Sequence, residues 1–139
     1  MCSVNVIDSL DNLPQSLVIL DCRYNDITSM DYLPFCLLEL CCNNNPIKEL
    51  QNLYPQLKVL NCSDCLITNL NNIPDSIEKL YCNRNKIKRF ARLPTNLIEL
   101  SCTGNPFNYD YNPTIRNIQK DLISSTIENK IKHNEKRIK

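Results

Sequence analysis

The chain has 139 residues, of which 42% are hydrophobic, and its 16 Lys and Arg against 15 Asp and Glu leave a net charge of +1. A charge this close to zero gives no general attraction to nucleic acids or membranes, and one domain is expected at this length. The single glycine, Gly104, excludes glycine-rich phosphate loops, and no apolar run approaches the roughly 20 residues that span a bilayer. The first ten residues lack the basic and apolar regions of a secretory signal, so we expect a soluble protein that is not secreted by that route.

A period of 20 residues runs through most of the chain. In chain order, it predicts an incomplete leading repeat over residues 1–12, five full repeats over 13–112 and a C-terminal segment over 113–139. Each full repeat begins at a Leu-Pro or Ile-Pro pair, except that the third has Leu53 and places its proline at Pro55. The apolar columns that follow hold Leu17, Leu37, Leu57, Ile77 and Leu97, then Leu20, Leu40, Leu60, Leu80 and Leu100, then Cys22, Cys42, Cys62, Cys82 and Cys102, and then Ile27, Ile47, Ile67, Ile87 and Phe107.

Each repeat is expected to hold one short strand and to bury its apolar groups against the neighbouring repeats. Leu20 and Cys22 are two residues apart, so both face the same side of a strand. One turn cannot bury its apolar groups alone, whereas stacked turns can. The short repeat leaves no room for a full helix on the convex side, which should be extended or hold 3₁₀ turns. The predicted fold is an α/β repeat solenoid, a curved stack with a parallel β-sheet on its concave face and a C-terminal capping helix.

An asparagine column follows the predicted strands. The backbone must turn sharply after each strand, which leaves inward N–H and C=O groups that a buried amide side chain satisfies. Cysteine takes the place once, as a weaker donor that fits the same volume. The sequence therefore predicts a structural asparagine ladder made of Asn5, Asn25, Asn45, Cys65, Asn85 and Asn105.

The C-terminal segment is predicted to form one amphipathic helix over about residues 113–132, with Asn112 as N-cap and Pro113 at the first helical position. Its apolar residues recur at three- and four-residue steps. We expect it to cap the last turn by covering Leu97, Leu100 and Phe107. Residues 130–139 carry a net +4, which leaves −3 for the rest of the chain, so membrane or calmodulin-like binding by this basic helix is the alternative.

Nine cysteines, an odd number without a signal peptide, favour reduced thiols in a reducing, cytoplasmic compartment. Cys62-x-x-Cys65 has the spacing of half a zinc site or a redox pair, but both residues belong to inward columns and His133 is the only histidine. No metal, cofactor or catalytic constellation is therefore predicted, and we do not expect an enzyme. Cys36 and Cys41 fall outside the inward columns and are the expected accessible thiols.

The pattern L-x-x-L-x-C-x-x-N-x-I, preceded by L-P-x-x, resembles the leucine-rich-repeat family over roughly Cys2 to Phe107. The short repeat and its L-P element resemble the bacterial-effector subclass, and the Asn-, Ile- and Lys-rich composition with Cys in this column is similar to repeat proteins of giant DNA viruses of amoebae. The resemblance implies a curved solenoid that binds proteins on its concave face, with a host protein as partner, and it implies no enzyme site. Two departures are the missing N-terminal cap and the short C-terminal segment, where effectors of this type often carry a ligase domain.

The outward strand columns supply the candidate partner-binding residues. Tyr81 has the composition of an interaction hot spot with Val59, Lys79 and Glu99 around it, and Arg23 with Tyr24 is a second candidate. The alternative is that these are ordinary solvated positions. A possible anion patch consists of five bases without an intervening acid, against the alternative of a solvated edge: Arg84, Lys86, Lys88, Arg89 and Arg92.

The sequence thus favours a non-catalytic module that binds a partner protein on its concave face. The first alternative is a structural or assembly protein that self-associates weakly through an open N-terminal edge of the stack. The second is anion or nucleic-acid binding through the bases of the fourth repeat and the tail, and the absence of interleaved aromatic residues argues against it.

Overall fold

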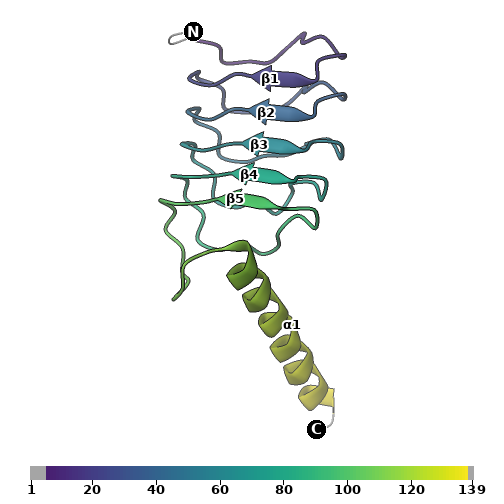
Figure 1. The fold of residues 1–139 in the computed structure, drawn as a ribbon, viewed down its shortest axis with the longest axis vertical. Coiled ribbons are helices and arrows are strands. Elements are labelled where there is room, and N and C mark those ends of the chain that lie inside the picture. Colours follow the sequence, from purple (N-terminus) through teal and green to yellow (C-terminus); the bar gives the residue numbers. More distant parts are fainter. Residues whose placement is uncertain (1–5, 138–139) are drawn as a thin grey trace.

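The computed structural model describes residues 6–137 and contains one five-stranded parallel sheet with strands in sequence order (Figure 1). Neighbouring strands pair in register with an offset of 20 residues, so Leu20, Leu40 and Leu60 lie side by side. This register confirms the predicted repeat solenoid. The strands are β1 (Ile19–Asp21), β2 (Glu39–Cys41), β3 (Val59–Asn61), β4 (Lys79–Tyr81) and β5 (Glu99–Ser101).

The core lies behind the sheet and consists of the predicted apolar columns. The middle residue of each strand points inward, and Leu40, Leu60 and Leu80 are fully buried. We call the segment that leads from the end of one strand to the next repeat the return path. The isoleucine column lies on the return paths and closes the core from that side, where Ile27, Ile47, Ile67 and Ile87 are also fully buried. The return paths are extended, and residues 6–137 contain no 3₁₀ helix. Every turn therefore buries its apolar groups only against its neighbours, as stacking requires.

An aromatic column that the sequence analysis missed continues the core past the last strand. Phe107 stacks between Phe90 and Tyr109, with ring centroids 5.4 Å apart in both pairs, and Tyr111 follows at 4.7 Å from Tyr109. The Phe90 N–H donates to the Tyr109 hydroxyl at 2.8 Å, which joins the return path of the fourth full turn to the segment after β5. These rings extend the stack beyond the repeat pattern.

Helix α1 (Ile115–Arg137) begins two residues later and ends five residues later than the sequence predicted. Thr114, and not Asn112, is the N-cap, because its Oγ1 accepts a hydrogen bond from the Asn117 N–H at 3.2 Å. The Asn112 carbonyl instead accepts from the Asn117 side-chain amide at 3.1 Å. Pro113 therefore precedes the cap, although Asn and Pro have the residue types of a helix start.

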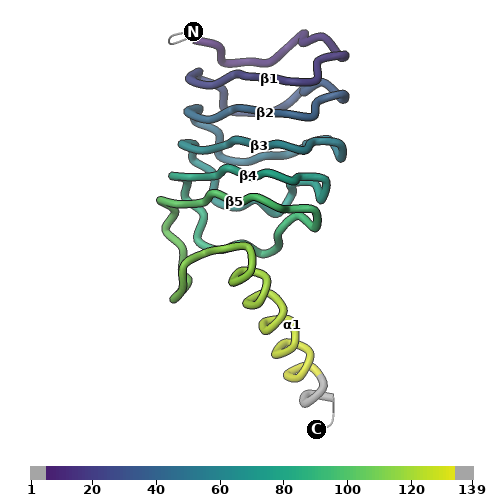
Figure 2. Tube along the Cα trace, viewed as in Figure 1, coloured from purple at the N-terminus to yellow at the C-terminus, as the bar shows by residue number. Residues whose placement is uncertain are grey.

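The first turns of α1 pack on the last repeat, and the remainder extends away from the stack (Figure 2). Ile118 is fully buried, and Leu97 beneath the cap is 8% exposed, while Leu100 and Phe107 are half-buried. Arg89 ties the helix to the fourth full turn through an ion pair with Asp121 at 2.8 Å and a hydrogen bond to Ser125 at 3.1 Å. The predicted cap therefore involves only the N-terminal part of the helix.

Candidate functional site

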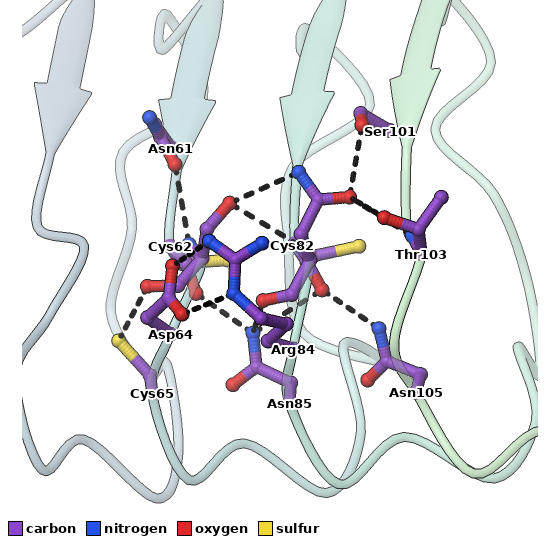
Figure 3. A network of polar contacts seen from close by, with 12 residues as sticks. Asn61, Cys62, Asp64, Cys65, Cys82, Arg84, Asn85, Ser101, Thr103 and Asn105 are labelled. Atoms are coloured by element: carbon purple, nitrogen blue, oxygen red, sulfur yellow. Dashed lines mark hydrogen bonds and ion pairs between the residues drawn. The ribbon is translucent and has the colours of Figure 1, made fainter.

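The asparagine column holds each turn in place behind the outward sheet face (Figure 3). Asn45 Nδ2 donates to the carbonyls of Cys22 at 3.0 Å and Cys42 at 2.9 Å, and its Oδ1 accepts from the Ile27 N–H at 3.0 Å. Asn85 and Asn105 make the same set of bonds one and two turns beyond Cys65. Asn25 donates within its own turn and accepts from Ile7, whereas Asn5 lies outside the described residues.

The turn after each strand uses a left-handed backbone conformation. In each full repeat one residue of this turn has positive φ, and only the last of these five residues is glycine. A Cβ on Gly104 would lie 2.8 Å from the Arg84 Cγ, so this turn has no space for a side chain. Asn and Asp tolerate this conformation, whereas Tyr and Arg adopt it at a cost. The column comprises Tyr24 (φ 56°), Asn44 (59°), Asp64 (53°), Arg84 (49°) and Gly104 (71°).

The sheet face, which we define as the outward side chains of β1–β5, carries a polar cluster on its last two strands. The Tyr81 hydroxyl donates to Glu99 Oε1 at 2.7 Å, and Lys79 Nζ lies 3.5 Å from Glu99 Oε2. The hydrogen bond from Tyr81 lowers the pKa of Glu99, and the same bond raises the pKa of Tyr81. We call Lys79, Tyr81 and Glu99 the tyrosine cluster, and Val59 lies beside Lys79 in the sheet register.

Arg23 and Tyr24, the second predicted binding pair, lie at the other end of the sheet after β1. Arg23 Nη2 is 2.8 Å from Asp21 Oδ2, and Tyr24 is exposed. The structure therefore brings Val59 to the tyrosine cluster but keeps Arg23 and Tyr24 three strands away.

An exposed apolar group on β1 and β2 was missed by the sequence analysis. Val18 is 44%, Ile19 57% and Leu38 38% exposed, and these three residues form what we call the apolar patch. Val18 and Leu38 are on neighbouring turns, joined by a 2.8 Å hydrogen bond from the Leu38 N–H to the Val18 carbonyl. Glu39 follows Leu38, pairs in register with Ile19, and has no ion pair with any described residue. Comparison of the residues just before each strand would have revealed this patch.

The comparisons with known proteins place this geometry in a fold family. No model of a known protein family matches the sequence, and neither does the sequence of any curated protein. Among solved structures, YopM from Yersinia enterocolitica, a bacterial-effector leucine-rich-repeat protein, is similar with a TM-score of 0.54 and 28% sequence identity. The match covers 74% of this chain. The chain has a leucine-rich-repeat fold of the bacterial-effector-like type. It spans 28% of the YopM chain that it matches.

One column of these leucine-rich repeats, two residues after each strand, is buried in the middle of the stack. Asn43 and Ser63 are buried, because the neighbouring turns cover them. Asn83 is half-buried, and its Oδ1 accepts hydrogen bonds from the Ser101 hydroxyl at 2.8 Å and the Thr103 N–H at 2.9 Å. The middle members of this column therefore join one turn to the next.

The predicted anion patch is largely engaged in contacts between leucine-rich repeats. Arg84 Nη2 lies 2.6 Å from Asp64 Oδ2, Arg92 pairs with Asp75, and Arg89 holds the helix as described above. Lys86 and Lys88 remain as bases that have no ion pair with a described residue. The five bases therefore do not form one field of free positive charge.

The cysteines of the inward columns are buried, and the two cysteines outside these columns are more exposed, as the repeat predicts. Cys22, Cys42, Cys62, Cys65, Cys82 and Cys102 are buried without disulfides, and Cys36 and Cys41 are half-buried. Burial raises the pKa of Cys22 to about 12 and that of Cys102 to about 11. A raised pKa keeps a thiol protonated near neutral pH and lowers its reactivity.

Other kinds of site find little support in the described part of the chain. No group of three His, Cys, Asp or Glu residues there has a geometry for a metal ion. An open cleft of about 360 Å³ lies beside Met30, Asp31 and Lys48, and it has a mixed polar lining. No helix within residues 6–137 has the length and apolar character to cross a membrane.

Proposed function

We propose that this chain is a non-catalytic interaction module that binds a partner protein on its sheet face, in a reducing compartment such as the cytoplasm. The leucine-rich-repeat fold supports protein partners in general. The effector-like repeat favours a host protein as that partner, and the reduced, buried thiols favour the compartment.

The observation that carries the proposal is the arrangement of the tyrosine cluster. Glu99 fixes the Tyr81 ring from one side through a 2.7 Å hydrogen bond and also lies 3.5 Å from Lys79. A tyrosine held in one orientation loses less conformational entropy on binding than a free one, which favours affinity. Tyr81 is half-buried, and Val59 lies beside Lys79 of the same cluster in the register of β3 and β4, so aromatic, aliphatic and charged groups gather in one region, as in interaction hot spots.

A quantitative pull-down with the intact chain tests the proposal. The Val59→Ala, Tyr81→Ala double variant should lose at least about 90% of a specific partner, which corresponds to the loss of one hot spot. The matched control is Lys86→Ala, Lys88→Ala, which removes two exposed side chains from a return path and should capture the partner like the wild type. Equal capture by all three proteins, with unchanged melting temperatures, would contradict binding at the tyrosine cluster.

A further inference from the structure

Two exposed apolar surfaces of this chain have complementary character. The first is the apolar patch of the first two turns, where Ile19 is exposed on β1 and Val18 and Leu38 are exposed just before β1 and β2. Glu39 lies within this patch, exposed and without an ion pair to any described residue. A partner for this surface therefore needs aliphatic side chains and one positive charge close to them.

The second surface is on the part of helix α1 that leaves the stack (Figure 1). Ile123, Ile127 and Ile131 are spaced four residues apart, so they form one stripe on the helix, and they are 61%, 52% and 53% exposed. Lys130 is three residues after Ile127 and is exposed beside this stripe. The first turns of the helix are engaged with the last repeat, whereas no other part of the chain within residues 6–137 covers the isoleucine stripe.

We propose that the isoleucine stripe of one copy of this chain packs on the apolar patch of a second copy, with Lys130 beside Glu39. The charge distribution supports a second copy as the occupant. Residues 130–139 carry a net charge of +4, and the rest of the chain carries −3, so the end of the helix is attracted to the body of another molecule. If the α1 helices of two copies packed on each other instead, their positively charged C-terminal ends would be brought together and would repel.

The dimensions of the two elements also agree. The isoleucine stripe from Ile123 to Ile131 is about 12 Å long at the ordinary rise per residue, and β1 and β2 are about 5 Å apart at the ordinary strand spacing. The stripe is therefore long enough to cover the apolar patch on these two turns. One helix on one face falls short of the roughly 1,600 Å² of a standard interface. A reciprocal exchange of helices between two copies makes two such contacts, so the assembly is a symmetric pair.

Sedimentation velocity of the intact chain over a range of concentrations tests this pairing. The wild type should approach twice its monomer mass, and Ile127→Lys should weaken the association at least about tenfold. Ile98→Lys is the matched control, because Ile98 occupies the same repeat position as Val18 and Leu38, is 70% exposed, and lies just before β5, outside the apolar patch. This control should associate like the wild type, and thermal melts should show that all variants fold.

A charge exchange identifies the two surfaces as partners. Glu39→Lys and Lys130→Glu should each weaken the association, and the double variant should restore it. No restoration in the folded double variant would overturn the pairing of these surfaces, and so would a wild type that stays monomeric at high concentration. A monomer that binds phosphatidylserine vesicles through Ile127 would assign the stripe to a membrane instead. Loss of association in Val6→Lys but not in Ile127→Lys would assign the contact to the N-terminal edge.

The proposed pairing of two copies goes beyond the proposed function, and an experiment can contradict the pairing without contradicting the binding of a partner protein. Tyr81→Ala should leave the sedimentation of the chain unchanged, because the tyrosine cluster lies on β4 and β5 and the apolar patch on β1 and β2. Capture of a partner by the tyrosine cluster would persist if the pairing were wrong.

Discussion

Cys65 occupies the asparagine column but satisfies the backbone less well than an amide. Its Sγ lies 3.6 Å from the Cys42 carbonyl and 3.5 Å from the Ser63 carbonyl, and its single proton can be donated to only one of them at a time, whereas the amides of the neighbouring turns donate to two. Burial raises the pKa of Cys65, and the N–H groups of Asn45 and Ile47 act against that shift. The Ile47 N–H therefore meets a sulfur where its counterparts meet an amide oxygen.

Substitutions in this column should have opposite effects at two positions. Asn45→Ala should lower the free energy of unfolding by about 1–3 kcal/mol, because it leaves buried backbone groups unpaired. Cys65→Asn should be neutral or stabilising, since the amide supplies both the donors and the acceptor. Urea denaturation of both variants measures these differences. A clear loss of stability in Cys65→Asn would show that the column does not act through its amides.

Tyr32 carries a backbone strain that its neighbours in the stack avoid. It has φ 63° at a position where the turns before and after have Asn12 at 63° and Asn52 at 57°. A left-handed conformation costs a bulky residue about 1–2 kcal/mol, and asparagine adopts it more readily. Tyr32→Asn should therefore raise the free energy of unfolding by about 0.5–1 kcal/mol.

Calorimetry or urea denaturation of Tyr32→Asn checks this expectation. Tyr54→Asn serves as the control, because Tyr54 is also an exposed tyrosine but does not have positive φ. A gain of equal size in both variants would indicate that the removal of an exposed aromatic ring, and not the backbone conformation, is responsible.

At the scale of elements, helix α1 divides into a part that stabilises the stack and a part that does not. Ile118 is fully buried and Asp121 pairs with Arg89, whereas the isoleucines from 123 onward are exposed. Deletion of residues 113–139 should make the chain aggregate or unfold without cooperativity, because Leu97 and the aromatic column lose their cover. Deletion of residues 127–139 should change the melting temperature little.

Far-ultraviolet circular dichroism and light scattering of the two truncated chains measure this division. Equal behaviour of both deletions would contradict it. If the shorter deletion also aggregates, the exposed end of the helix contributes to the stack through contacts that the single chain does not show.

The strands and the core were predictable because a stacked repeat turns a sequence period into spatial neighbours. Leu20, Leu40 and Leu60 had to lie side by side once the period was known. The same rule applies to charges: Arg84 and Asp64 are 20 residues apart and form an ion pair, so the period would have revealed that this base of the anion patch is engaged.

Features outside the period were not predictable in this way. Tyr109 and Tyr111 come after the last strand, and their stacking depends on the path of that segment. The choice of Thr114 over Asn112 as N-cap depends on the same path, since both residue types cap helices well. Likewise, the burial of Asn43 and Ser63 results from contacts between neighbouring turns and not from their own polarity.

For the whole molecule, the buried thiols predict a loss of stability at alkaline pH. Burial raises the pKa of Cys22 to about 12 and that of Cys102 to about 11, from an ordinary 9.0. Above about pH 9 the unfolded chain therefore loses thiol protons that the folded chain keeps, and deprotonation favours unfolding. The contribution of these thiols to the free energy of unfolding should be constant below pH 9. It should fall as the pH rises further, by up to about 1.4 kcal/mol per pH unit for each thiol.

Urea denaturation at pH 7, 9 and 10 measures this slope. Cys22→Ala removes one of the thiols, so its stability should fall less steeply with pH than that of the wild type, whatever the substitution costs at pH 7. Identical slopes would mean that Cys22 is more accessible to solvent than its burial indicates.

Binding at the sheet face is tested most directly by site-specific photo-cross-linking in the full chain. A photo-reactive residue placed at Lys79, within the tyrosine cluster, is compared with one at Asn69, which is exposed on the return path of the neighbouring turn. We expect the probe at position 79 to join the chain covalently to a different protein, and the probe at position 69 to give little or none of that product. Cross-links to the same protein from position 69 alone, or equally from both positions, would contradict binding at the sheet face.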